Sequence, residues 1–236
     1  SLKIEQVDAF LAQFLTPFAA ATCRIYRGRL RGFLTYLYHE RNILKRDLAP
    51  LVVSRQEYAQ AKPPNFLRPQ QIRKLFAALT IGSGSDIQTY AMVQLAYTMG
   101  LRPKEISRIS LDDISFSTQQ LKIPRRKSTN PVELPMPEQT VKAIAAYVIA
   151  ARPQSEHRRV FLTRLPPFRP VSPNGVARHI TKTMKKATLP STAYWLRHTY
   201  AQNLLEVGCS IFEIKEMLGH DKIESIKSIN CIPANL

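Results

Sequence analysis

The sequence has few cysteines, few acidic residues and no long apolar run. Its three cysteines, Cys23, Cys209 and Cys231, are odd in number and widely spaced, which fits neither a disulfide framework nor a zinc site and is typical of a reducing cytosol. No apolar run reaches the roughly 18 residues needed to cross a bilayer, and no signal peptide opens the chain. We therefore expect a cytoplasmic protein that does not enter membranes. Because the chain begins at Ser1 and not at Met, we also expect a fragment or a processed chain.

Basic side chains outnumber acidic ones two to one. The chain has 34 Lys and Arg residues against 17 Asp and Glu residues, which leaves a net charge of +17 and a pI near 10.1. Such an excess favours a nucleic-acid partner, with a basic ribosomal or membrane-surface protein as the alternative. Apolar residues make up 44% of the 236 residues, which is enough for a core and too many for a disordered chain. The length allows two modest domains or one large one.

The first part of the chain has the apolar periodicity of helices. The second predicted helix also carries a row of arginines on its remaining surface. A solvated face and contact with phosphates explain that row equally well, and the basic character of the chain favours DNA slightly. The two apolar stripes are Val7, Phe10, Leu11 and Phe14, then Tyr26, Leu30, Phe33, Leu34 and Leu37, and the arginines are Arg24, Arg27, Arg29 and Arg31.

Two adjacent prolines, Pro63 and Pro64, interrupt the helical pattern and indicate a linker over residues 61–65. The sequence therefore predicts a helical domain over residues 1–60 and a second domain over 66–236. The second domain is expected to be helical around one β-hairpin, so the fold class is mainly α with a small antiparallel sheet. Its predicted elements are helices over 69–79 and 87–99, a loop over 82–85, a hairpin over 119–136 with its tip at 127–131, and helices from Val141 onward, interrupted by a proline-rich stretch at 166–173.

The first motif with chemical potential surrounds Arg102. Gly100 suits the left-handed conformation that ends a helix, and Pro103 suits the first position of the next one. Arg102 would then lie at a helix N-terminus, where free N–H groups and the dipole favour an anion. Its guanidinium can donate two hydrogen bonds to a phosphate. Many surface arginines precede helices, so this motif alone favours the ordinary explanation.

The second motif is the basic tip of the predicted hairpin, Arg125-Arg126-Lys127. A lysine on a short turn can deliver a proton to a leaving oxygen. Most charged hairpin tips serve only solubility, so this motif, too, is weak by itself.

The third motif spans residues 194–220, where Gly208 ends one predicted helix and a second follows. This spacing brings Arg197 and His220 to a place where successive helices converge. A histidine after Leu-Gly is, by itself, usually a helix-terminus residue with a satisfied hydrogen bond. The predicted core positions of the second helix are Ile211, Ile214, Met217 and Leu218.

Taken together, these stretches resemble the tyrosine recombinase (phage integrase) family. The order of the boxes, their separations and the basic hairpin between them all match over roughly residues 66–236, and the joint match is far more specific than any single box. The segment that begins at Thr22 resembles part of the family's helical core-binding domain, without its start. The matching boxes are residues 98–105, 196–199, 204–208 and 218–220.

The resemblance implies two domains that bind opposite faces of duplex DNA and form a 3′-phosphotyrosyl intermediate. It implies that the protein needs no cofactor and no metal. It also implies that two chains bind each DNA site as a dimer and that four chains form the tetramer of the synapse, with accessory proteins as possible further partners. Arg102 and Arg197 would stabilise the phosphate, Lys127 would protonate the leaving 5′-oxygen, and His220 would bind the phosphate and support the nucleophile. Glu105 would brace the arginine helix. Further DNA contacts are expected from Arg24, Arg27, Arg31, Arg125, Arg126 and His198.

Two positions depart from the family pattern. Tyr194 stands where the family usually has a histidine, and a phenol of pKa near 10 is a poor general base. Ile229 stands about nine residues beyond His220, where the nucleophilic tyrosine is expected, and no tyrosine follows Tyr200. An altered chain, a degenerate relative, or a truncated or shifted segment would each explain the isoleucine. We favour an altered or incomplete version of an active enzyme.

The sequence is compatible with three functions. The first is a site-specific recombinase of a bacterium or mobile element, acting in integration, excision, resolution or transposition at the nucleoid. The second is a DNA-binding relative without catalysis that occupies or regulates recombination sites, which the missing tyrosine supports. The third is a type IB topoisomerase, against which the compact integrase-like boxes argue.

Overall fold

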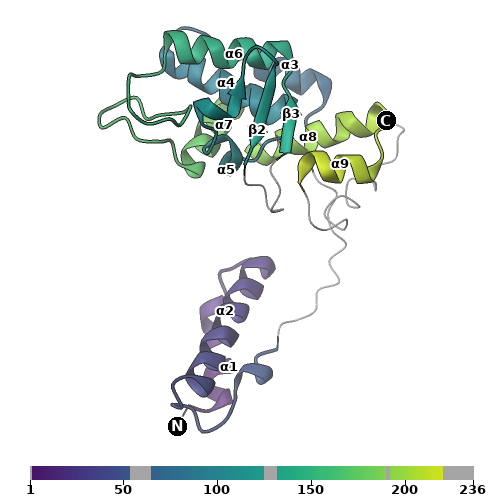
Figure 1. Cartoon of the computed structure of the whole chain (residues 1–236). Coiled ribbons are helices and arrows are strands. Elements are labelled where there is room, and N and C mark those ends of the chain that lie inside the picture. Colours follow the sequence, from purple (N-terminus) through teal and green to yellow (C-terminus); the bar gives the residue numbers. More distant parts are fainter. Residues whose placement is uncertain (1, 54–64, 125–131, 190–191, 220–236) are drawn as a thin grey trace. The chain divides into compact units, whose positions relative to one another are not determined.

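The structure, a computed structural model, describes residues 2–53, 65–124, 132–189 and 192–219 (Figure 1). The chain divides into two compact units, Ser1–Gln60 and Ala61–Leu236. Each unit has its own buried apolar cluster. None of the described helices is both long enough and apolar enough to cross a membrane.

The first unit consists of α1 (Ile4–Leu15), α2 (Ala20–His39) and the short 3₁₀ helix η1 (Ala49–Leu51). The two predicted apolar stripes fall within α1 and α2. The core of this unit is small because only one side of each helix finds a partner. It contains Val7, Leu11, Leu15, Leu34, Leu44, Leu48, Ala49 and Val52.

Part of the predicted apolar stripe lies on the surface, and here the sequence-based prediction was wrong. Phe10, Phe14 and Phe33 are 55%, 39% and 54% exposed. A two-helix unit has a single helix contact, so residues beyond that contact have nothing to pack against. The Phe10 and Phe14 rings stack at 5.3 Å instead, and Tyr26 meets Phe14 edge to face at 5.2 Å.

The second unit is built around α4 (Gly84–Thr98), whose residues from Ala91 to Ala96 are almost completely buried. Its buried residues, which include Gln88 and Gln94, lie on all sides of the helix, as expected of a helix surrounded by others. It packs against α6, α7 and α8, and α4 and α6 lie side by side in Figure 1. The remaining helices are α3 (Pro69–Ala77), α5 (Pro103–Ile106), η2 (Leu111–Asp113), α6 (Glu138–Ala150), α7 (Pro173–Lys186), α8 (Ala193–Glu206) and α9 (Ile211–Leu218).

A small antiparallel sheet with the strand order β1-β2-β3 accompanies these helices. The predicted hairpin is present as β2 (Gln120–Ile123) and β3 (Val132–Pro135), with Leu121 opposite Leu134, and the two strands lie together in Figure 1. The sequence did not predict β1 (Ile114–Ser115), because two residues are too few to show an alternating pattern.

The fold agrees with the predicted class, a mainly helical chain with a small antiparallel sheet. Some predicted boundaries move by two or three residues: α3 ends at Ala77 and α6 begins at Glu138. The helix α4 begins at Gly84, within the predicted loop, because the Ser83 hydroxyl accepts a hydrogen bond from the Asp86 N–H and starts the helix earlier.

Candidate functional site

The candidate site begins where α4 ends. Gly100 has a φ of +60°, the left-handed conformation that the sequence predicts. A Cβ atom at this position would lie 2.4 Å from a Tyr200 ring carbon and 2.9 Å from a Leu218 methyl group, so glycine is required by space as well as by conformation. Pro103 is the first residue of α5 and Arg102 precedes it, as predicted.

The N-terminus of α5 is already occupied by an anion of the chain itself. The Arg102 N–H donates to Glu105 Oε2 at 2.7 Å, and Arg102 Nη1 donates to Glu105 Oε1 at 3.0 Å. The sequence interpretation of an open anion site at this helix end is therefore corrected, since the Glu105 carboxylate takes that place. Glu105 braces Arg102, and its side chain is only 7% exposed.

Arg197 reaches the same place from α8. Arg197 is 4% exposed. Its two terminal nitrogens donate to main-chain oxygens, Nη1 to that of Gly100 at 2.6 Å and Nη2 to that of Leu218 at 2.5 Å. Nη1 also lies 3.8 Å from Glu105 Oε2. A guanidinium donates in one plane, so two carbonyl bonds from separate elements fix its orientation.

Both guanidiniums converge on one oxygen. Arg102 Nη1 lies 3.4 Å from the Leu218 oxygen that also accepts from Arg197. The two arginines, from α5 and α8, are thus brought together around Glu105 and the end of α9. Arg102 is the more accessible, because 23% of its side chain is exposed against 5% for Arg197.

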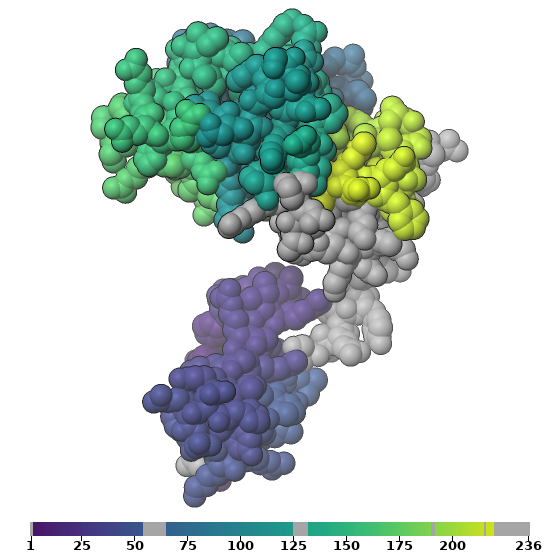
Figure 2. All heavy atoms as spheres, in the orientation of Figure 1, coloured from purple at the N-terminus to yellow at the C-terminus, as the bar shows by residue number. Residues whose placement is uncertain are grey.

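The end of α9 presents this oxygen. Leu218 is the last residue of the helix and is 1% exposed, and Gly219, with a left-handed φ of +62°, follows the helix end. In Figure 2 the surface of α9 (yellow) lies against the teal and green body of the second unit. Ile214 is buried as predicted, whereas Met217, predicted to face the core, is 37% exposed, because an eight-residue helix has room for few inward positions.

Two further predicted residues lie on α8 near Arg197. Tyr194 is 54% exposed. His198 is partly buried, and this burial lowers the pKa of its imidazole, with the neighbouring charge of Arg197 as the second cause. A neutral His198 is therefore favoured beside the arginine.

The arginines predicted on α2 do not share one environment. Arg24 is exposed, whereas Arg27 Nη1 donates to the Val53 oxygen at 3.4 Å and Arg31 Nε donates to the Val52 oxygen at 2.7 Å. Arg27 and Arg31 therefore hold the segment after η1 against α2. Five predicted residues lie outside the described part of the chain: Arg125, Arg126, Lys127, His220 and Ile229.

Sequence reasoning missed three cationic residues of the second unit, Arg108, Lys122 and Arg159. They line a hollow of about 440 Å³ that also borders Glu105. They belong to none of the motifs, and only the fold brings them together. Within the described residues, no group of three or more His, Cys, Asp or Glu side chains could hold a metal ion.

Comparison with known proteins shows the family. The family model described as "Phage integrase family" matches residues 65–229. The putative integrase/recombinase y4rA of Sinorhizobium fredii is 28% identical over 228 residues, covering 95% of this chain and 55% of y4rA. The tyrosine recombinase XerC of Lacticaseibacillus casei is 26% identical over 204 residues, covering 83% of this chain and 66% of XerC. The chain thus spans between half and two thirds of the length of these relatives.

Solved structures share the fold. The XerH site-specific recombinase bound to palindromic difH substrate superimposes with a TM-score of 0.78 at 15% identity, covering 98% of this chain and 69% of XerH. A lambda integrase (75–356) dimer bound to a COC′ core site gives a TM-score of 0.73 at 13% identity, covering 100% of this chain and 82% of the integrase. The family match spans both arginine boxes and the intervening sheet, and with this fold it means that the chain belongs to the phage integrase family of tyrosine recombinases.

Proposed function

We propose that this chain is part of a site-specific recombinase that cuts and rejoins duplex DNA. The observation that carries the proposal is the convergence of Arg102 and Arg197, from separate elements, on one oxygen acceptor beside Glu105. Two guanidiniums held in this way suit the non-bridging oxygens of a phosphodiester, where negative charge builds up in the transition state. The XerH structure bound to its difH substrate adds support from the same fold.

In the proposed reaction a tyrosine hydroxyl loses its proton to water as its oxygen attacks the phosphorus atom, and the bond from phosphorus to the 5′-oxygen breaks. A 3′-phosphotyrosyl link forms, and the departing 5′-oxygen takes a proton from Lys127. Arg102 and Arg197 stabilise the charge on the phosphate, His220 donates to it, and Tyr194 contributes a hydrogen bond in place of a histidine. Reversal with another 5′-hydroxyl rejoins the strands without ATP, because the covalent link conserves the energy of the phosphodiester bond.

The first unit is proposed to be the core-binding domain, with the exposed Arg24 as an available phosphate contact on α2. Arg27 and Arg31 would contribute charge while holding their own segment in place. Two chains on one DNA site and four in a synapse are the proposed assembly, and the lambda integrase dimer on a core site is consistent with it. The proposed location is the cytoplasm of a bacterium, at its DNA.

Position 229 limits this chain. Ile229 has no oxygen with which to attack phosphorus, so cleavage by the chain as it stands is not expected. The second candidate function, occupation of recombination sites without cutting, rests on this residue.

The decisive experiment restores the nucleophile. The Ile229→Tyr variant, incubated with a nicked suicide substrate carrying the recombination site, should form a protein–DNA adduct that survives a denaturing gel. Ile229→Phe is the matched control, since it adds the ring without the hydroxyl and should form none. Absence of an adduct from Ile229→Tyr on every cognate site that the chain binds would favour the non-cutting function.

A further inference from the structure

A second cationic surface lies next to the arginine pair. It is the hollow of about 440 Å³ between α5, β2 and the segment that leads to Val160. Its charged lining consists of Glu105, Arg108, Asp113, Lys122 and Arg159. Glu105 belongs to both places, because its carboxylate also binds Arg102.

The two carboxylates of the hollow differ, because Glu105 is paired with a cation, whereas the bond that Asp113 accepts comes from a neutral N–H, which does not neutralise its charge. Glu105 accepts from Arg102, as described, and Asp113 Oδ2 accepts from the Ser110 N–H at 2.8 Å. Arg159 Nη1 donates to the main-chain oxygen of Arg108, a neutral group that leaves the charge of Arg159 in place. Among the described residues, neither Arg108, Lys122 nor Arg159 forms an ion pair.

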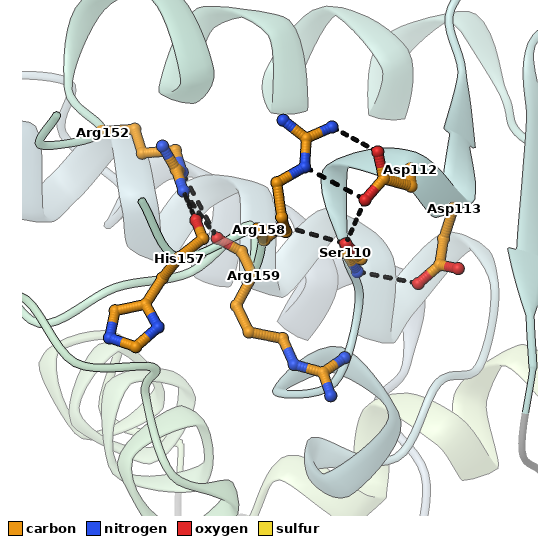
Figure 3. Close-up of polar contacts among 7 residues, drawn as sticks. All are labelled: Ser110, Asp112, Asp113, Arg152, His157, Arg158 and Arg159. Carbon is orange, nitrogen blue, oxygen red and sulfur yellow. Dashed lines mark hydrogen bonds and ion pairs between the residues drawn. The ribbon is translucent and has the colours of Figure 1, made fainter. Parts of the chain in front are cut away.

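The backbone beneath Arg159 is held firmly. The Arg152 guanidinium donates to the main-chain oxygens of His157, Arg159 and Val160 (Figure 3). Arg159 itself pairs with Ser110 through an antiparallel bridge. An arginine whose backbone is already fixed loses less conformational entropy on binding than an arginine on a free loop.

Neighbouring arginines on this segment are used in different ways. Figure 3 shows the Arg158 head group directed at Asp112, with which it forms an ion pair, and the Arg159 head group lying apart from that pair. The Arg158 partner lowers the pKa of the Asp112 carboxyl mainly through their hydrogen bond. The charge of Arg158 is thus paired at the surface, while Arg159 adds its charge to the hollow.

We propose that this hollow binds a second backbone phosphate of the same DNA duplex, next to the phosphate held by Arg102 and Arg197. This inference rests on the proposed function and assigns Arg108, Lys122 and Arg159 as its ligands. Two guanidiniums and one ammonium supply charge-assisted donors for the phosphate oxygens. Glu105 borders both places, so the proposed second phosphate belongs to the same strand as the phosphate held at Arg102. Such a contact fixes the position of the strand and carries no base specificity.

The test measures how DNA affinity depends on salt. The full chain and its variants are titrated with a mixed-sequence duplex of about 30 base pairs at several salt concentrations. Each lost phosphate contact lowers the slope of log affinity against log salt by about 1. Arg108→Gln is the principal variant, because no described side-chain bond is lost with it, and Lys122→Gln is the second.

The control is Arg158→Gln, which removes the same charge from the residue before Arg159, outside the lining of the hollow. Because the three cations share one phosphate, the slope should fall by at most about 1 for Arg108→Gln and for Lys122→Gln, and it should fall by clearly less for Arg158→Gln. If the slope falls by the same amount in all three variants, the inference is overturned, because the change would then reflect the loss of net charge alone. If the wild-type chain binds no duplex, the proposed function fails as well. Binding by the wild type with equal variant slopes overturns only the second phosphate site.

Discussion

Arginines are abundant in both units, but the two units hold them differently. In the second unit Arg197 is 4% exposed and donates to two main-chain oxygens from two other elements. In the first unit Arg24 is exposed, and Arg31 donates to the Val52 oxygen of the segment that follows α2. The comparison teaches that a row of arginines on a helix does not by itself identify a reactive site. Burial and fixed donors distinguish Arg197 from the arginines of that row.

The largest expected effect comes from changing the fixed arginine while keeping its charge. Arg197→Lys replaces a planar fork with a single ammonium, which cannot reach the Gly100 and Leu218 oxygens in the same way. In the Ile229→Tyr background we expect the single-turnover rate of adduct formation to fall by about 100-fold or more, with a much smaller change in DNA affinity. Arg158→Lys, on an exposed and paired arginine, is the control and should keep the rate. Equal losses in rate and affinity would argue against a role in the reaction.

The next effect concerns the turn that supports the pair. Gly100→Ala combines a left-handed residue, which costs about 1–2 kcal/mol, with overpacking against Tyr200, which costs about 1–3 kcal/mol. We expect the free energy of unfolding of the second unit to fall by about 3 kcal/mol. The fluorescence of Trp195, the one tryptophan of the chain, measures this unfolding. Gly208→Ala is the matched control: Gly208 has a φ of +89°, and a Cβ atom added there would have no neighbouring atom within 4 Å, so only the conformational cost applies. Similar losses in both variants would show that the close approach to Tyr200 is unimportant.

A smaller effect should separate the two kinds of arginine on α2. Arg31→Ala removes the hydrogen bond to the Val52 oxygen and should destabilise the first unit by about 1 kcal/mol. Faster amide exchange at Val52 and Val53 would report this loss. Arg24→Ala should leave the exchange unchanged and lower the salt dependence of DNA binding. If both variants changed amide exchange and salt dependence alike, Arg31 and Arg24 would not differ in role, and the division between stabilising the unit and contacting DNA would not hold.

The smallest effect is a dependence of stability on pH. Burial lowers the pKa of His179, and the charges of Lys182, Arg164 and Arg178 lower it further. Because the folded-state pKa lies below the ordinary value of about 6.5, the unfolded chain binds more protons between the two values. The stability contributed by neutral His179 is therefore complete above about pH 6.5 and is lost as the pH falls through the folded-state pKa.

The variant that tests this dependence is His179→Asn. The Thr89 hydroxyl donates to the Ser85 oxygen at 2.7 Å and lies 2.9 Å from His179 Nδ1, so an asparagine amide can replace the ring N–H. We expect a weaker loss of stability between pH 7.5 and 5.5 in denaturant titrations. His157→Asn, at an exposed histidine, should leave the pH profile as in the wild type. An unchanged profile in His179→Asn would assign the pH dependence to other groups.

The sequence predicts best where a local pattern determines the structure. The helix end at Gly100, the start of α5 at Pro103 and the hairpin of β2 and β3 follow from residue types within a few positions, and the structure confirms them. The exposure of Phe10 could not be predicted in this way, because it depends on how many helices are available to cover a stripe.

The same limit applies to the candidate site. Arg102 and Arg197 stand out through their motifs, but the sequence does not say that Glu105 fills the helix N-terminus between them. The hollow was missed for the same reason. Arg108, Lys122 and Arg159 come from three segments, and each looks like an ordinary surface cation until the fold brings them together.

The acceptor at the end of α9 has a consequence for how the chain can vary. Both guanidiniums meet at a peptide oxygen, which every amino acid at position 218 would supply equally. Replacing that buried side chain changes the packing around it but not the chemical identity of the acceptor, whereas inserting or deleting one residue in α9 would rotate the acceptor away by about 100°, the angle between successive residues of a 3.6-residue turn. The contact with the two arginines therefore constrains the length of α9 more directly than the chemistry of the side chain at position 218.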